Sequence, residues 1–321
     1  MGVYGSNFDY GDSPFYKDDD GSIVRSETLR FITLDESYYV DVNRPNYGYE
    51  TEIHMPISMQ QSIDGAYSFW DNGYPSNGAG VPDYRVISTS QWQNDPTTKA
   101  ALNEFFINTL KGRCENVTMS LGANPCGFFP FGPDYGDSGD FTVRLYDREQ
   151  SGRLQAPYNW FEDNLKLVLV PPAPAYTLPT QQPQGNFTIG SVQNIMFPQN
   201  GFQPVAKYNH QTGLTKTGVP YSIDGPSVQD SFETSFDQQC NQSKAAALCA
   251  LLTGSSGRTN DITIVGQSNF YAFGMDKGSA GTYTCKFLGS SNTKSEIIIT
   301  VKHIGFNQFE LPLNFWMKAA A

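Results

Sequence analysis

One pattern of apolar and polar residues occurs twice along the chain. Phe128 to Tyr146 and Phe270 to Leu288 align without a gap, and each runs from a glycine-rich segment into alternating apolar residues, as in a half-buried strand. The identical pairs are Phe128/Phe270, Phe131/Phe273, Gly132/Gly274, Asp134/Asp276, Gly136/Gly278, Gly139/Gly281 and Thr142/Thr284. The repeated glycines predict positive φ or close backbone packing. Two copies of one pattern predict two related modules, in which most repeated residues are structural.

The pattern continues upstream of each stretch with a predicted helix. The first helix covers 95–111, with Asp95 as N-cap, Pro96 in the first turn and Gly112 as the stop. The second helix ends before Gly254. The apolar stripes are Leu102, Phe105, Phe106 and Leu110 in the first, and Leu248, Leu251 and Leu252 in the second. We expect each stripe to cover one face of the sheet in its module.

Short alternating strands flank the glycine-rich segments in both copies. Residues 117–121 and 262–264 precede them, and residues 165–169 and 297–301 follow the central strands. The order strand, helix, strand, glycine loop, strand, loop, strand therefore occurs twice. The predicted fold class is mainly β (α+β), with two tandem β-sandwich modules that each carry one flanking α-helix.

A proline-rich segment, Pro171 to Gly185, predicts the boundary between the modules. We expect a first module over 1–170 with an acidic N-terminal arm, a linker over 171–185, a second module over 186–304, and a C-terminal tail over 305–321 without a counterpart in the first copy. Further strands are predicted at 30–42, 52–60 and 84–92, and residues 147–160 are predicted to form a loop.

The net charge of −11 is distributed unevenly. Residues 1–170 carry 24 acidic and 12 basic residues, whereas the rest of the chain carries 8 and 9. This distribution argues against tight binding to a phosphate backbone, which needs a basic patch, and suits a surface along which DNA slides. No apolar run is long enough to cross a membrane, so no membrane insertion is expected.

Candidate chemistry is sparse. The best acidic cluster is Asp134, Asp137 and Asp140, a weak candidate metal site, because the second copy has Ser279 and Thr282 at the last two positions. The shared role of this loop is then to turn the chain. His54, His210 and His303 lack metal-binding spacing, and no nucleotide-binding or nucleophile motif occurs. We therefore expect neither a cofactor nor an enzyme, although paired carboxylates for glycoside hydrolysis are not excluded by sequence.

The thiols and the loop aromatics have two interpretations each. Five cysteines, an odd number without a CxxC motif, favour reduced thiols in a chain made in a cytoplasm, with Cys285 buried. The aromatics of the first module are typical either of a sugar-binding platform or of contacts with adjacent subunits, the second being more common. They are Trp70, Tyr135, Tyr146, Tyr158 and Trp160.

The first module resembles the minor tail and distal tail proteins of long-tailed bacteriophages, which share the tail-tube fold. The resemblance lies in the element order, in a strand with Trp92, in PFGP at 130–133, in Val143-Arg144-Leu145 and in the strand 165–170. It covers roughly 30–170 and, through the repeat, 186–303. The internal duplication is similar to that of baseplate hub proteins.

The resemblance implies a non-enzymatic virion protein, made in the host cytoplasm. It would form a ring in the tail tip, bind neighbouring tail-tube and tail-tip proteins, and let DNA pass through the lumen without specific binding. Two modules per chain favour three chains per ring over six. The alternatives are a major tail-tube protein with a duplicated module, a carbohydrate-binding protein and, least favoured, a hydrolase.

Overall fold

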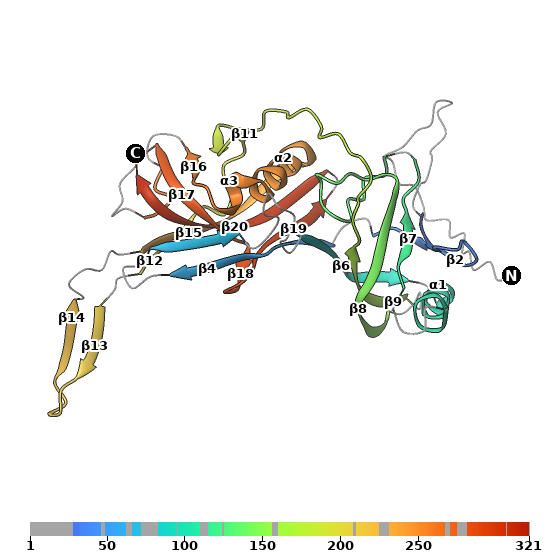
Figure 1. Ribbon diagram of the computed structural model, residues 1–321, viewed down its shortest axis with the longest axis horizontal. Coiled ribbons are helices and arrows are strands. Elements are labelled where there is room, and N and C mark those ends of the chain that lie inside the picture. Colours follow the sequence, from blue (N-terminus) through green and yellow to red (C-terminus); the bar gives the residue numbers. More distant parts are fainter. Residues whose placement is uncertain are drawn as a thin grey trace. The chain divides into compact units, whose positions relative to one another are not determined.

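The computed structural model shows a mainly β chain that divides into two compact units (Figure 1). It describes residues 28–45, 49–61, 66–71, 83–94, 96–109, 115–123, 125–155, 160–207, 210–224, 231–266, 270–274, 281–305 and 307–320. Unit 1 comprises Met1–Glu52, Tyr84–Thr177 and Lys302–Asn307, and unit 2 comprises Ile53–Asp83, Leu178–Val301 and Gln308–Ala321. The boundary at 177/178 falls inside the proline-rich segment. The segment 53–83, however, belongs to unit 2, although its sequence lies in the predicted first module.

Unit 1 contains a sheet with one helix packed against it. Its strands are β1 (Thr28–Thr33), β2 (Tyr39–Asn43), β6 (Tyr84–Asn94), β7 (Val117–Ser120), β8 (Asp140–Gln155) and β9 (Trp160–Leu169), together with part of β3 (Glu50–Met55). The strand order is β3-β6-β9-β8-β7-β1-β2. Helix α1 (Pro96–Asn103) continues into the π-helix η1 (Glu104–Thr109).

Two of the predicted boundaries in this region are wrong. The single strand expected at 30–42 is a hairpin, because Asp35 accepts hydrogen bonds from the Thr33 hydroxyl and from the Ser37 backbone and hydroxyl, which close a turn. The same bonds lower the pKa of Asp35 to about 2. The loop expected at 147–160 is largely strand, since β8 runs on to Gln155 and pairs with β9.

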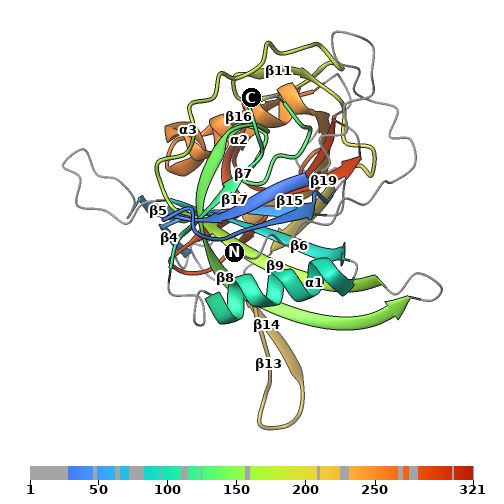
Figure 2. The same ribbon diagram turned by 90° about the vertical axis from the view of Figure 1, so that its right-hand side faces the viewer.

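The core of unit 1 lies between the sheet and helix α1–η1. The helix packs against β2, β6 and β9, and Figure 2 shows it beside β6 and β9. Leu102, Phe105 and Phe106 are buried as predicted. The π-helical turn is wider than an α-helical one, which lets the consecutive Phe105 and Phe106 both face inward. Their rings meet Phe31 from β1 at 6.4 and 5.2 Å. The helix thus covers strands from both ends of the sheet.

Unit 2 contains a second series of strands with its own helix. Its strands are β4 (Ile57–Gln61), β5 (Tyr67–Asp71), β10 (Phe187–Ile189), β11 (Val192–Ile195), β12 (Gln203–Lys207), β13 (His210–Leu214), β14 (Pro220–Asp224), β15 (Ser231–Asn241), β16 (Ile262–Val265), β17 (Thr282–Gly289), β18 (Ser291–Asn292), β20 (Gln308–Ala320) and part of β19 (Ile297–Gly305). One path through the sheet is β11-β10-β16-β17-β20-β15-β12, and β4–β5 and β13–β14 are separate hairpins. Helix α2 (Gln242–Thr253) and the short α3 (Ser255–Arg258) follow β15.

The two strand orders correspond position by position. The first series has the order β3-β6-β9-β8-β7-β1-β2, and the second has the order β12-β15-β20-β17-β16-β10-β11. Strands at the same place in the two orders correspond, so that β6 corresponds to β15 and β9 to β20. The helices agree with this correspondence, because α1 packs against β2, β6 and β9, and α2 against their counterparts β11, β15 and β20. We call β1–β9 the first repeat and β10–β20 the second repeat. The shared order supports the predicted duplication, while the tail-tube identity of the modules stays a prediction.

The register of the strands corresponds as well. Val117 pairs with Val143 in the first repeat and Ile262 with Cys285 in the second, as the sequence alignment requires. The ladder between β8 and β9 is irregular at Tyr146, and the ladder between β17 and β20 is irregular at the equivalent residue, Leu288. A bulge at the same place bends both strands in the same way.

The predicted counterpart of the strand 165–169 is wrong. It is β20, not β19, that lies beside β17 and β15 as β9 lies beside β8 and β6. The C-terminal segment, predicted to be a tail without a counterpart, is thus a central strand. Its alternate residues Phe309, Leu311, Leu313 and Phe315 are all buried. Strands β18 and β19 lie between β17 and β20 along the chain, and the sequence alignment therefore matched the strand 165–169 with β19 instead of β20.

The prediction that the repeated glycines have positive φ is confirmed at some of the pairs, and the repeated phenylalanines are buried. Phe128, Phe131, Phe270 and Phe273 are all buried. Gly132 and Gly274 both have positive φ, 105° and 90°, so this pair needs glycine in both repeats. Gly139 has a φ of 88°, but Gly281 lies outside the left-handed region. Gly278 lies outside the described residues.

The proline-rich segment 171–185 carries neither helix nor strand, as predicted. Its first half packs on the glycine loop of unit 1, where a Cβ on Gly136 would lie 2.4 Å from the ring of Tyr176. Its second half binds unit 2, where Lys244 Nζ donates to Gln181 Oε1 at 3.1 Å. The linker is therefore held at both ends.

The buried stripe of the first helix allows a stability test. We expect Phe105→Ala to lower the free energy of unfolding by about 3–5 kcal/mol, because it empties a buried aromatic site. Chemical denaturation followed by tyrosine and tryptophan fluorescence measures the change. Substitution of the exposed Ile107 by Ala is the matched control and should cost less than about 1 kcal/mol. A similarly small loss for Phe105→Ala would contradict the packing described for this helix.

Candidate functional site

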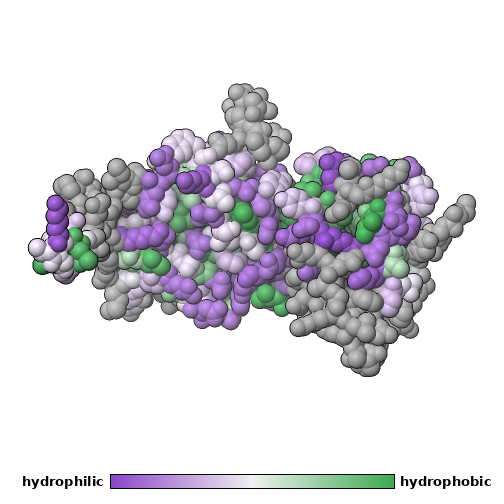
Figure 3. Space-filling view, turned by 90° about the horizontal axis from the view of Figure 1, so that it is seen from below, coloured by the Kyte–Doolittle hydropathy of each residue, from purple (hydrophilic) through white to green (hydrophobic). Residues whose placement is uncertain are grey.

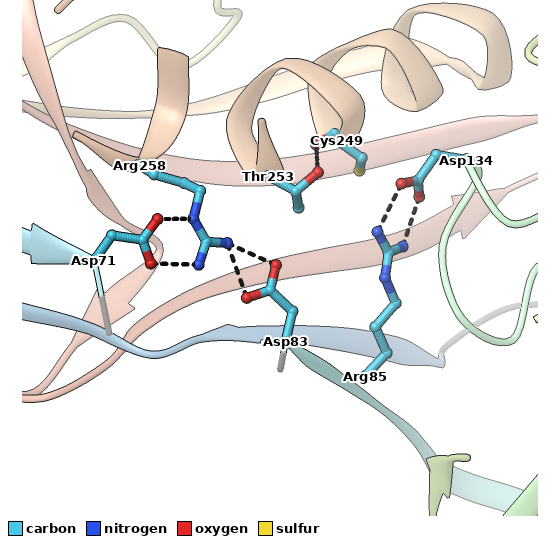
Figure 4. Close-up of polar contacts among 7 residues, drawn as sticks. All are labelled: Asp71, Asp83, Arg85, Asp134, Cys249, Thr253 and Arg258. Atoms are coloured by element: carbon cyan, nitrogen blue, oxygen red, sulfur yellow. Dashed lines mark hydrogen bonds and ion pairs between the residues drawn. The ribbon is translucent and has the colours of Figure 1, made fainter. Parts of the chain in front are cut away.

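The repeated acidic loop is held together by a buried ion pair. Nη1 and Nη2 of Arg85 donate to the two carboxylate oxygens of Asp134, each at 2.7 Å (Figure 4). The two side chains are only 6% and 7% exposed. Arg85 also donates to the Phe131 carbonyl oxygen at 2.6 Å and lies 3.8 Å from the centroid of the Tyr135 ring. A Cβ on Gly132 would lie 2.8 Å from this guanidinium, so the close approach requires glycine. This arrangement fixes a turn.

The three candidate metal ligands are directed to different partners. Asp134 binds Arg85, Asp137 accepts from the Gly127 backbone at 2.7 Å, and Asp140 accepts from the Ser120 hydroxyl at 2.5 Å. Among the residues that the structure describes, no group of three His, Cys, Asp or Glu side chains is placed to hold a metal ion. The carboxylates thus act in hydrogen bonding within the loop.

The loop aromatics are divided between the two units. Tyr135 packs against Arg85 and the core of unit 1, and Tyr146 is 64% exposed on β8. Trp70, which is 51% exposed, belongs to unit 2, and the side chains of Tyr158 and Trp160 lie outside the described part. The ring of His303 stacks on that of Tyr49 inside unit 1. None of the described helices is long and apolar enough to span a membrane.

A further polar arrangement surrounds the hairpin β4–β5, and we call it the seat of this hairpin. The sequence reasoning missed it. Tyr67 donates to Glu233 of β15 at 2.9 Å, and its ring meets Trp316 of β20 edge-on at 5.6 Å. Burial and the hydrogen bond to Glu233 raise the pKa of Tyr67, so its hydroxyl remains a donor. The ring of Phe69 lies 5.7 Å from Lys286 Nζ of β17. A hairpin from the first repeat thus packs on three strands of the second.

An ion cluster holds the end of this hairpin (Figure 4). Arg258 donates from Nε and Nη2 to the two oxygens of Asp71, at 2.6 and 2.7 Å, and from Nη1 to both oxygens of Asp83, at 2.8 and 2.7 Å. Asp71 ends β5 and Asp83 precedes β6, so one guanidinium joins the two ends of the connection 72–82. The hydrogen bond to Asp71, followed by those to Asp83, raises the pKa of Arg258. Bidentate pairing of this kind favours a fixed geometry.

Sequence reasoning missed this seat for two reasons. The predicted strand 52–60 is interrupted at Pro56, which has no N–H for a ladder, and the chain enters β4 in unit 2. Arg258 is also separated from Asp71 and Asp83 by 187 and 175 residues along the chain. The arrangement has two features of an assembly contact, aromatic anchors and a charged clamp.

Comparison with known protein families finds no matching family model, and comparison with curated proteins finds no similar sequence.

The buried ion pair of unit 1 gives a second stability test. We expect Arg85→Met to lower the free energy of unfolding by about 3–5 kcal/mol, because it leaves the carboxylate of Asp134 buried and unpaired. The double variant Arg85→Met with Asp134→Leu should recover most of this loss, since neither charge then remains. Denaturant titration of both variants provides the measurement. A double variant less stable than Arg85→Met would show that the pair itself supplies the stability.

The described cysteines give a chemical test. Cys126, Cys240, Cys249 and Cys285 are buried free thiols, and burial raises the pKa of Cys126, Cys240 and Cys285. We expect all four to resist iodoacetamide at pH 8 in the folded protein, because the thiolate is the reactive form. Mass spectrometry of tryptic peptides should show their alkylation only after denaturation. Rapid labelling of Cys285 in the native chain would contradict its position in the core.

Proposed function

We propose that the chain is a non-enzymatic structural component of a phage tail tip, in which it forms a distal tail or hub ring that continues the DNA-conducting tube. One observation carries this proposal: a seven-strand order with a helix across its ends occurs twice in one chain, in the same register. The resemblance of the first module to tail-tube-fold proteins attaches a function to that repeated unit.

Two further observations support assembly rather than catalysis. A hairpin of the first repeat packs on strands of the second, so the two repeats are joined by side-chain contacts within one chain. The acidic excess is confined to residues 1–170, so in a ring it would repel DNA phosphates at some module positions. A genome could then pass without being held.

The number of chains per ring follows from the duplication. In tail-tube rings six module positions are expected by resemblance, and a chain with two modules fills two of them. The segment 171–185 is held at its two ends by different units, which favours neighbouring positions. Three chains would then form a pseudo-sixfold ring, whereas six chains would form two stacked rings.

Native mass spectrometry of the full-length chain tests the ring. We expect a species of three times the 35.6 kDa mass of one chain, and rings with a central channel in negative-stain electron microscopy. Six chains per particle would replace the single ring by two stacked ones. A stable monomer at high concentration would contradict the ring. Copy number in isolated virions separates a tip ring, with few copies, from the tail tube, with many.

A further inference from the structure

Strands β3 and β12 occupy the same place in the two repeats. They stand first in the two strand orders, and an aromatic residue directly precedes each, Tyr49 before β3 and Phe202 before β12. The ring of Tyr49 meets that of Phe128 edge-on at 4.8 Å, and the ring of Phe202 meets that of the equivalent Phe270 edge-on at 4.8 Å. Tyr49 and Phe202 are therefore equivalent, and β3 and β12 begin at the same point of their repeats.

In the first repeat this strand is covered by another strand of the same chain. Strand β19 lies beside β3 in the sheet. The backbone N–H of His303 in β19 donates to the carbonyl oxygen of Tyr49 at 3.1 Å, and the His303 ring stacks on the Tyr49 ring at 4.8 Å. Tyr49 is consequently only 2% exposed. Because β19 belongs to the second repeat, the strand that covers one repeat comes from the other.

In the second repeat the equivalent strand is open. Among the described strands, β12 pairs with β15, beside which Figure 1 shows it, and with no other. All five of its residues are exposed, and Val205 is 49% exposed. Phe202 is half-buried, and Phe197, whose ring packs on it at 5.4 Å, is 41% exposed. An edge strand beside partly exposed aromatic rings is typical of a surface that a partner covers.

We propose that β12, together with Phe197 and Phe202, binds a strand of a second copy of this chain, which takes on β12 the place that β19 has on β3. The first repeat indicates the kind of partner, because the strand that covers its edge is part of this same chain. Repeated between chains, the contact is head-to-tail and closes into a ring when the rotation is suitable. The proposal specifies an interface of the ring proposed above and rests on it.

A proline in β12 limits the form of this contact. Pro204 has no N–H to donate, and it stands two residues after Phe202, where β3 has Thr51 two residues after Tyr49. The backbone ladder on β12 is therefore short, and the side chain of Val205 and the two aromatic rings contribute to the contact. Proline at an edge also opposes indiscriminate strand addition, which suits a specific interface.

The hairpin β13–β14 also exposes apolar side chains. Leu214, Val219 and Tyr221 are 70%, 57% and 44% exposed. Figure 3 shows hydrophobic atoms at its left-hand end, where Figure 1 places β13 and β14. The described contacts do not indicate an occupant for these three residues. Val219 is therefore a matched control for Val205, since both are exposed valines of unit 2.

The first test compares these two valines in the full-length chain. Val205→Lys should weaken self-association roughly tenfold or more, because a lysine on an edge strand opposes the addition of another strand. It should leave the unfolding temperature of the dissociated chain unchanged, because the side chain of Val205 is exposed. The control Val219→Lys should leave both quantities unchanged. Sedimentation equilibrium and thermal unfolding monitored by circular dichroism give the two readouts.

Amide hydrogen exchange of the unmodified chain locates the contact directly. Exchange in the peptide that covers 203–207 should slow roughly tenfold or more when the chain assembles, whereas exchange in the peptide that covers 214–221 should not change. A Val205→Lys chain that associates normally, or β12 amides that exchange equally fast in both states, would overturn this contact and leave the ring standing. Association lost in Val219→Lys alone would likewise overturn it. An unmodified chain that stays monomeric would overturn both proposals.

Discussion

Each sheet of this protein must bury one apolar face, and a single helix helps to bury it. The helix packs against strands from both ends of the sheet, β2 and β6 in one repeat and β11 and β15 in the other. One short helix contacts both ends only if the sheet curves around the core, and the bulges at Tyr146 and Leu288 help to produce that curvature.

Sequence reasoning found the parts of the fold that depend on local patterns. The repeat, the buried stripes and the glycine loop were visible because alternation and helical periodicity are local properties. The alignment failed at β9, because the pairing partner of a strand is a long-range property and the inserted β19 has the same alternation of buried residues as β20. The seat of β4–β5 was missed for a similar reason: nothing near Asp71 or Asp83 indicates that Arg258 lies beside them.

The strand residue that fixes the first glycine loop differs in the second repeat. In the first repeat the charged pair Arg85 and Asp134 fixes the turn, while Gly132 leaves room for the guanidinium. The residue equivalent to Arg85 in the second repeat is Phe232, which is buried and apolar. Asp134 is nevertheless matched by Asp276, so the identical aspartates in the alignment do not share this ion-pair partner. Identity between repeats therefore located the turn but not the interaction that holds it.

A duplicated chain has a kinetic advantage in the proposed ring. The packing of β4–β5 on the second repeat is intramolecular, as the contacts of Tyr67 and Arg258 show, and an intramolecular contact forms at a high effective concentration. In the proposed ring, six module positions then require only three encounters between chains. The remaining contacts can be weaker individually, because closure makes each depend on the others.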